Sequence, residues 1–204
     1  MAKKYSLSFT ACSLRLNSFT RLIKDVGAVE HQISMNYVNA EVLLNKGNEG
    51  SSKRELSELI KRYNNLTLNQ KQLFLNSGLD ERKQLAFLAT CKTYQLLSDF
   101  VLEVLREKVL VYNHDILEGE LLTFYNRKAE LHPELEDFAD STRKKAFQHV
   151  WKILEEADMI HSTTTKTIKQ PWLSEQMIRV VAEDKPENLK LFLLTDTDLK
   201  HAVK

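Results

Sequence analysis

Residues 80–108 read DERKQLAFLATCKTYQLLSDFVLEVLREK, and this stretch decides the fold class. At helical spacing its apolar residues form two stripes. One holds Leu85, Leu88, Ala89, Leu96, Leu97, Phe100, Val101, Val104 and Leu105, and the other holds Phe87, Cys91 and Tyr94. A helix that is apolar on two sides is usually buried at the centre of a bundle. We therefore predict a long central helix that Asp80 caps and that runs to about Lys108.

The composition around this stretch also indicates helices. The 204 residues include only five Gly and three Pro, and 29 basic side chains balance 28 acidic ones. We expect one globular domain with an N-terminal helical part, 1–66, and a central and C-terminal helical part, 67–204. No window approaches the roughly 18 consecutive apolar residues of a membrane span, so we expect a soluble, cytoplasmic protein without a membrane partner. Near-zero net charge excludes a histone-like basic protein, so any anion-binding surface must be a local patch.

Helical spacing and breaker residues place the other helices. Capping residues start several of them: Ser52 with Glu55, Asp140 with Ser141, and Ser174. The expected helices cover residues 5–28, 38–44, 52 onward, 68–75, 116–131, 140–160, 174–183 and 186–194.

Residues 161–170 break the helical pattern. They read HSTTTKTIKQ, and β-branched residues of this kind favour strands. We predict a small β-hairpin near residues 161–171. The expected fold class is thus mainly α, a compact helical bundle with a small β-hairpin and a winged-helix-like C-terminal part. In the alternative interpretation, an ordinary surface hairpin closes the core beneath Trp151 and Trp172.

The sequence offers no catalytic or metal motif. The glycines form no phosphate-binding or dinucleotide pattern, the six histidines form no metal-ligand spacing, and the two cysteines make no disulfide framework. Ser141 and Lys144 have the spacing of a serine–lysine nucleophile pair, but Ser141 is better explained as a helix cap. We expect a protein that is not an enzyme and uses no cofactor.

One cationic run opposes a local preference. Arg143, Lys144 and Lys145 stand in the first turns of a predicted helix, where the positive end of the helix dipole disfavours cations. Free backbone N–H groups, the dipole and three cations all favour the same anion, so this run predicts a phosphate site. The alternative is a solvated salt-bridge cluster with neighbouring acidic residues.

Other basic residues extend this prediction. Lys166 and Lys169 lie on the predicted hairpin, in the order of a winged helix whose wing contacts the DNA backbone. Arg15 and Arg21 form a second cluster on the first helix. Lys92 and Lys128 are weaker candidates for phosphate contacts. Whether these clusters share one face is left open.

Several segments resemble a known family. YSLSFTA at 5–11, NRKAELHPEL at 126–135 and DSTRKK at 140–145 are similar to the BrxA family, core proteins of the bacteriophage-exclusion (BREX) defence systems. The resemblance implies a cytoplasmic, nearly all-helical protein without known catalytic activity, which acts beside a methyltransferase, an ATPase and other defence proteins. It also implies double-stranded DNA binding through a basic groove and a likeness to the RNA-binding factor NusB. At Asp158–Ile160 the chain departs from the Ala-Gly-Leu turn that the resemblance implies.

These observations lead to three hypotheses. The principal one is a non-enzymatic double-stranded DNA-binding component of a BREX system that contacts phosphates. The alternatives are a protein–protein adaptor within the defence complex and a NusB-like RNA-binding regulator. The candidate nucleic-acid-binding residues are Arg143, Lys144, Lys145, Lys166, Lys169, Arg15, Arg21, Lys92 and Lys128.

Overall fold

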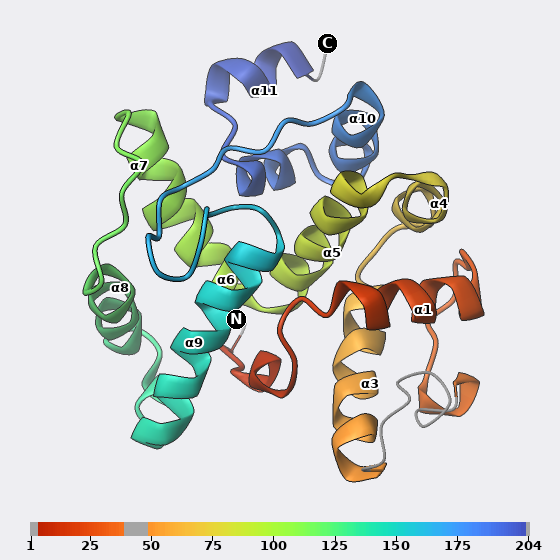
Figure 1. Cartoon of the computed structure of the whole chain (residues 1–204), viewed down its shortest axis with the longest axis horizontal. Helices are drawn as coiled ribbons and strands as arrows, with labels where there is room; N and C mark the ends of the chain where they lie inside the picture. The colour runs from red at the N-terminus through yellow and green to blue at the C-terminus, as the bar shows by residue number, and fades with distance from the viewer. Residues whose placement is uncertain (1–3, 39–48, 203–204) are drawn as a thin grey trace.

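The fold consists of helices packed around one central helix, α5. The computed structural model describes residues 4–38 and 49–202. In Figure 1, α5 (Leu79–Thr93) lies in the middle, α3 (Glu49–Asn64) and α9 (Asp140–Glu156) lie below it, and α4 (Leu68–Asn76) and α10 (Glu175–Asp184) lie on the opposite side. The remaining elements are η1 (Ser8–Ala11), α1 (Leu16–Val26), η2 (Met35–Tyr37), α8 (Glu120–Ala129), η4 (Pro133–Leu135), η5 (Pro186–Phe192) and α11 (Asp196–Ala202). The mainly helical fold class is confirmed, and one buried cluster draws side chains from both ends of the chain.

The decisive stretch is buried as predicted but is not one helix. Every residue from Gln84 to Cys91 is buried, which agrees with a central helix that is apolar on two sides. The helix ends at Thr93, because Tyr94 has φ −119° and ψ 98°. The chain then continues as α6 (Gln95–Phe100), a π-helical segment over residues 101–106, and α7 (Glu107–Leu110). The expectation of one continuous helix to Lys108 was therefore wrong.

A buried arginine explains the second departure, at residues 5–28. Arg62 on α3 donates from Nη2 to the Cys12 carbonyl at 3.0 Å and from Nη1 to the Ser13 and Leu14 carbonyls at 2.7 and 3.2 Å. These hydrogen bonds satisfy carbonyls of a stretch that lies outside the helices. Instead of one helix, the chain forms η1, an extended stretch and α1, whose N-cap residue Arg15 lies in the left-handed region at φ 52°.

Three residues that were predicted to cap helices do not cap them, because each helix begins earlier in the sequence. α3 begins at Glu49, so Ser52 lies inside it and is buried. α5 follows Gly78 as N-cap, which places Asp80 in the first turn. α9 follows Ala139, and neither Asp140 nor Ser141 caps it. Residues 39–44 of the expected helix 38–44 lie outside the described residues.

Two helix starts follow local sequence rules. The Ser174 hydroxyl accepts a hydrogen bond from the Met177 N–H at 3.2 Å and caps α10, as predicted. Thr67 and Gln70 form a reciprocal capping box at the start of α4. Among residues 4–38 and 49–202, no helix has the length and apolar character that crossing a membrane requires.

The β-hairpin is not confirmed. Around residues 161–171 the structure has two isolated antiparallel bridges, Ile160 with Ile168 and Asp115 with Thr167, and the described residues contain no strand. A loop returns Ile168 to the buried core and leaves Trp172 81% exposed, so this segment neither forms a wing nor buries Trp172. In the turn before it, Asp158 lies in the left-handed region at φ 58°, a conformation that glycine adopts most readily.

Candidate nucleic-acid interface

Two long helices begin at the same edge of the molecule. In Figure 1, α3 and α9 both start at the lower edge, with η1 between them. The first N–H groups of a helix lack partners within the helix, and the dipole adds partial positive charge there. This edge therefore favours anions before any side chain is considered.

A surface hollow of about 470 Å³ lies between the two helices. Its lining comes from η1, the first turns of α3, and α9: Thr10, Ala11, Gly50, Ser51, Arg54 and Lys145. The side chains of Arg54 and Lys145 are exposed. Within the described part of the chain, neither of them has an ion-pair partner, whereas Lys92, Lys108 and Lys128 each pair with a carboxylate. No described anion therefore compensates the two positive charges of the hollow.

His149 connects Arg15 to this surface. It stands one turn after Lys145 on α9, and its Nδ1 is buried without a hydrogen-bond partner. Burial lowers the pKa of His149 below its ordinary value, and the charges of Lys145, Lys152 and Arg15 lower it further, against the opposing charge of Glu156. Arg15 contacts Glu55 on α3, and the preceding Leu14 N–H donates to Glu156 on α9 at 2.8 Å, so Arg15 lies between the two helices.

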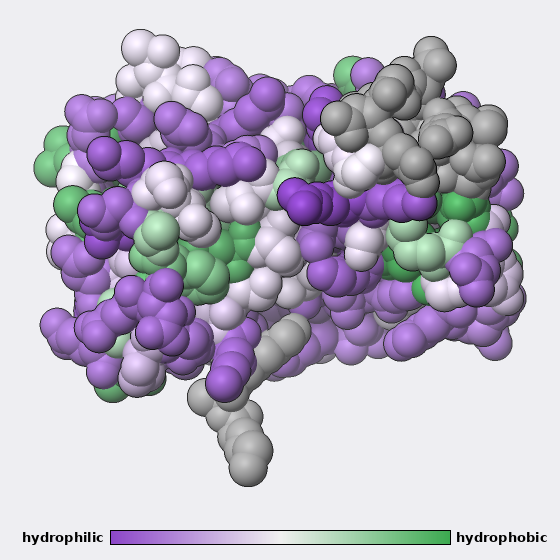
Figure 2. Space-filling view, turned by 90° about the horizontal axis from the view of Figure 1, so that it is seen from below, coloured by the Kyte–Doolittle hydropathy of each residue, from purple (hydrophilic) through white to green (hydrophobic). Residues whose placement is uncertain are grey.

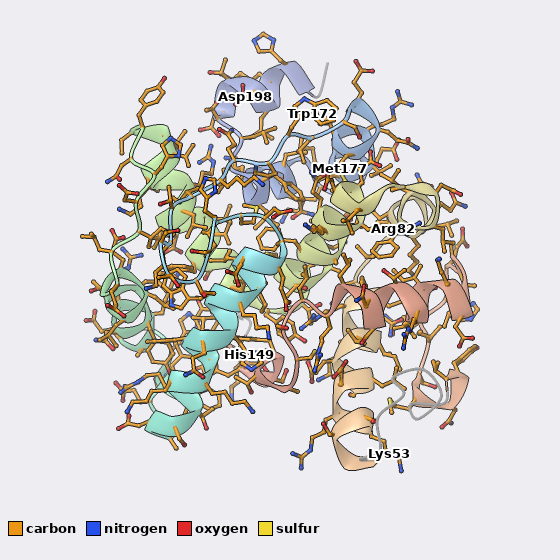
Figure 3. All side chains as sticks on the ribbon, in the orientation of Figure 1. Lys53, Arg82, His149, Trp172, Met177 and Asp198 are labelled. Atoms are coloured by element: carbon orange, nitrogen blue, oxygen red, sulfur yellow. The ribbon has the colours of Figure 1, made fainter. Side chains whose placement is uncertain are left out.

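Part of this face is neutralised. Arg15 lies 3.4 Å from the buried carboxylate of Glu55, and Arg143 pairs with Asp140 at 2.8 Å within the first turn of α9. Lys144 is exposed and, among the described residues, makes no ion pair. We call the surface formed by Arg54, Lys145 and Lys152 together with Arg15 the α3–α9 basic face. Figure 3 labels Lys53 near the lower end of α3 and His149 on α9, which mark its two sides.

Hydrophilic side chains dominate this edge of the molecule. Figure 2 views it from below and shows purple side chains over most of the surface, with smaller white and green areas between them. A polar, locally cationic surface of this kind suits a charged, hydrated partner better than an apolar one.

Lys166 and Lys169 do not join the basic face. The Lys166 ammonium lies 5.5 Å from the centre of the Trp151 ring and 3.9 Å from Glu118, and its side chain is mostly buried. Lys169 lies 3.9 Å from Asp158, at the edge of another cleft. The winged-helix placement of these two residues is not supported, because the segment that carries them is not a wing.

The remaining predicted residues lie elsewhere. Lys92 pairs with Asp184 on α10 at 2.7 Å. Lys128 lies between Asp99 and Glu103, and its side chain is 13% exposed. These two lysines already have anionic partners and hold helices together. Arg21 is exposed on α1.

Arg54 is the site residue that sequence reasoning missed. With the helix start placed at Ser52, Arg54 was one cation in a polar helix and carried no special signal. With the start at Glu49, Arg54 stands in the second turn beside the open end of the helix. The signal that could have found it is the Gly50-Ser51 pair, since small residues expose the backbone N–H groups of a first turn.

Comparisons with known proteins give the family and support the fold. The crystal structure of an uncharacterized protein from Magnetospirillum magneticum superimposes with a TM-score of 0.71 at 19% identity and covers 94% of this chain and 98% of that one. At that identity the likeness concerns the fold alone. No curated protein matches the chain. The BrxA family model matches residues 3–185, and the chain therefore belongs to the BrxA family.

Proposed function

We propose that this protein is a non-enzymatic, cytoplasmic double-stranded DNA-binding component of a BREX system, and that the α3–α9 basic face contacts DNA phosphates. Membership of the BrxA family indicates a role in BREX phage defence. The DNA-binding activity is our inference from the surface. A BREX methyltransferase and ATPase are the partner proteins that we expect beside it.

The hollow between α3 and α9 is the observation that carries this proposal. Arg54 and Lys145 line it without ion-pair partners among the described residues, and α3, a helix of 16 residues, begins beside it. Full charges and backbone donors at one place favour a phosphate group. Lys152, which lies 4.0 Å from Glu156 on the same helix, extends the cationic surface along α9.

The same features predict little sequence discrimination. Contacts with phosphates orient a protein on the duplex but carry no direct sequence information. We therefore expect binding to duplexes of unrelated sequence with similar affinity.

The test is fluorescence anisotropy with labelled duplex DNA, single-stranded DNA and RNA of equal length. The Arg54→Glu/Lys145→Glu variant should lose at least about tenfold in duplex affinity, because two charge-assisted contacts become repulsions. The matched control is Arg179→Glu/Lys185→Glu, which makes the same charge change at exposed residues on and just after α10. The control should bind as the wild type does.

Each other outcome has a defined meaning. Equal loss in both variants would show that only net charge matters and would contradict the site. Preference for RNA would contradict the duplex-DNA proposal and support the NusB-like RNA-binding regulator. Absence of binding at low salt would overturn the proposal.

An adaptor role is the second candidate, and exposed apolar residues favour it. Val111, Tyr112 and Leu117 between α7 and α8 are 71%, 90% and 67% exposed. Contiguous exposed apolar side chains often mark protein interfaces. Co-purification with defence proteins that survives nuclease treatment, without DNA binding by the isolated protein, would support this role.

A further inference from the structure

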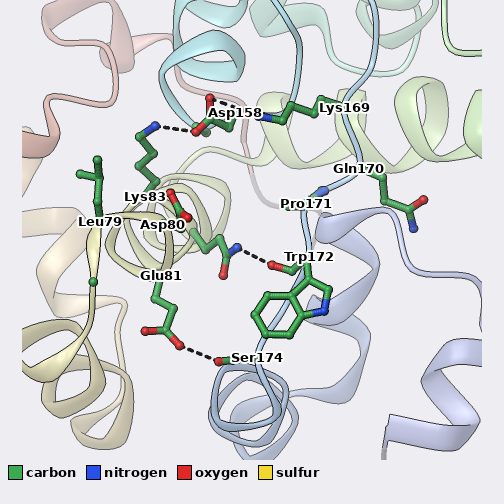
Figure 4. Close-up of a pocket in the computed structure, with 13 residues that line it drawn as sticks. Leu79, Asp80, Glu81, Lys83, Asp158, Lys169, Gln170, Pro171, Trp172 and Ser174 are labelled. Carbon is green, nitrogen blue, oxygen red and sulfur yellow. Dashed lines mark hydrogen bonds and ion pairs between the residues drawn. The ribbon is translucent and has the colours of Figure 1, made fainter.

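A second cleft lies far from the basic face. Its volume is about 490 Å³, and it opens between the start of α5, the end of α9 and the segment before α10. Figure 4 shows residues that line it, and Figure 3 places Trp172 at the opposite end of the molecule from Lys53. None of the residues that line this cleft lines the hollow of the basic face.

One buried side-chain atom in this cleft lacks a hydrogen-bond partner. Gln84 is 7% exposed, and its Nε2 donates to the Trp172 carbonyl at 2.8 Å. That bond identifies the other atom as the carbonyl oxygen, which is buried and accepts no hydrogen bond. An unsatisfied buried acceptor costs about 1–3 kcal/mol, so the cleft is chemically incomplete without a donor.

The charges in the cleft call for a cationic donor. Asp158 compensates both lysines, since it contacts Lys83 at 2.5 Å and Lys169 at 3.9 Å. Asp80 forms no ion pair with any described residue, and Glu81 accepts a hydrogen bond from the Ser174 hydroxyl at 2.6 Å. Two lysines therefore face three carboxylates, and the groups left without full compensation are acceptors.

The rim of the cleft is aromatic and apolar. Trp172 is 81% exposed and Leu79 is 62% exposed, and both line the cleft. Indole is the best of the aromatic side chains at attracting a cation over its face. An exposed indole next to carboxylates therefore suits a planar cation that can stack and donate at once.

We propose that this cleft binds an arginine side chain of a partner protein. A guanidinium is planar, carries a permanent positive charge and offers five N–H donors, so it can stack on Trp172 while donating to Gln84 and Asp80. A lysine ammonium has no plane to stack, and a phosphate is repelled by the carboxylates.

A peptide-borne arginine fits better than free arginine. Free arginine brings its own carboxylate, which would face Asp80 and Glu81 at short range. An arginine within a chain has no such charge. The exposed Leu79 and Trp172 side chains also extend beyond the cleft and can contact the residues on either side of the arginine.

The test uses the full chain and three short blocked peptides, Gly-X-Gly, in which X is arginine, citrulline or lysine. The shift of the Trp172 indole N–H resonance is followed by nuclear magnetic resonance as each peptide is added. Citrulline keeps the shape of arginine without its charge. The arginine peptide should bind at least about tenfold more tightly than the other two, because charge-assisted hydrogen bonds are about twice as strong as neutral ones.

Two variants decide the site without threatening the fold. Asp80→Asn should weaken arginine binding by about two- to fivefold, the range of exposed ion pairs. Asp137→Asn, an exposed residue before α9, is the matched control and should leave it unchanged. Equal binding of the arginine and citrulline peptides, equal binding of the lysine peptide, tighter binding of free arginine, or an unaltered Trp172 resonance would each overturn the proposal. The duplex-binding experiment tests other residues, so either proposal can fail alone.

Discussion

Two arginines eight residues apart on α3 have opposite environments. Arg62 is 1% exposed, and its guanidinium holds the carbonyls of Cys12 and Ser13. Arg54 is exposed beside the hollow and pairs with no described residue. The same side chain on the same helix serves the fold at one position and remains available to a ligand at the other.

The difference lies in the groups that face each arginine. The buried network around Arg62 includes Tyr94, whose hydroxyl donates to Glu58 at 2.6 Å. Partial burial would raise the pKa of Glu58, but hydrogen bonds from Lys61 and Tyr94 lower that pKa below its ordinary value. Glu58 is thus held as an anion that balances Arg62. Around Arg54 no described anion plays this part.

Arg62→Met should have the largest effect on the free energy of unfolding. Removing one partner of a buried charged network costs about 3–5 kcal/mol, because the carbonyls of residues 12–14 lose their donor and the Glu58 carboxylate loses the cation that balances it. Chemical denaturation measures this loss. Arg54→Met is the matched control and should change the free energy of unfolding by less than about 0.5 kcal/mol. Equal losses would erase the distinction between the two arginines.

Tyr94→Phe should have an intermediate effect. It removes the hydroxyl that donates to Glu58 and leaves a buried carboxylate oxygen with fewer donors, at a cost of about 1–3 kcal/mol. Tyr112→Phe makes the same change at a 90% exposed residue and should be neutral in the same denaturation experiment. A neutral Tyr94→Phe would mean that the network does not explain the break after α5.

The smallest effect concerns His149 at the basic face. Burial and nearby cations lower its pKa in the folded protein, so the unfolded chain binds more protons at mildly acidic pH. Stability from this group is present above the unfolded pKa of about 6.5 and falls as pH drops toward the folded pKa. Lys145→Met should raise the pKa of His149 and reduce this acid sensitivity.

Titration of the His149 resonances by nuclear magnetic resonance measures that pKa directly. Lys185→Met removes an equivalent charge just after α10 and should leave the pKa unchanged. An unchanged pKa in Lys145→Met would separate His149 from the basic face.

Local rules predicted part of this fold, and distant contacts account for most of the rest. The Ser174 cap depends on residues three positions apart, and the burial of residues 84–91 follows from their own pattern. Tyr94, at the break, hydrogen-bonds Glu58 and Arg62, which lie 36 and 32 residues away in sequence. No periodicity within 80–108 could reveal these contacts. The β-branched residues of 163–168 favoured strands, but only Thr167 and Ile168 pair, each in an isolated bridge, and 163–165 form a turn.

The candidate site was predicted only in part, because contacts between distant residues decide which cations are paired. Lys145 was identified because cations at a helix start oppose a local preference. Lys92 pairs with Asp184 on α10, and Lys128 pairs with Asp99 on α6. The sequence did not reveal these acidic partners, because they lie on other elements. Arg54 gained its place only from the packing of α3 beside α9. Unpaired charge is a property of the fold, and composition alone does not show it.

The salt dependence of duplex binding shows whether the α3–α9 basic face contacts phosphates, because its slope counts the phosphates that the protein neutralises. Four or five contacts predict that log K falls with log salt at a slope of about −4 for the wild type. Arg54→Met/Lys145→Met should bring the slope to about −2, whereas Arg179→Met/Lys185→Met should leave it near −4. If the slope is the same in all three proteins, the cations of the hollow between α3 and α9 do not contact phosphates, and the account of this face is wrong.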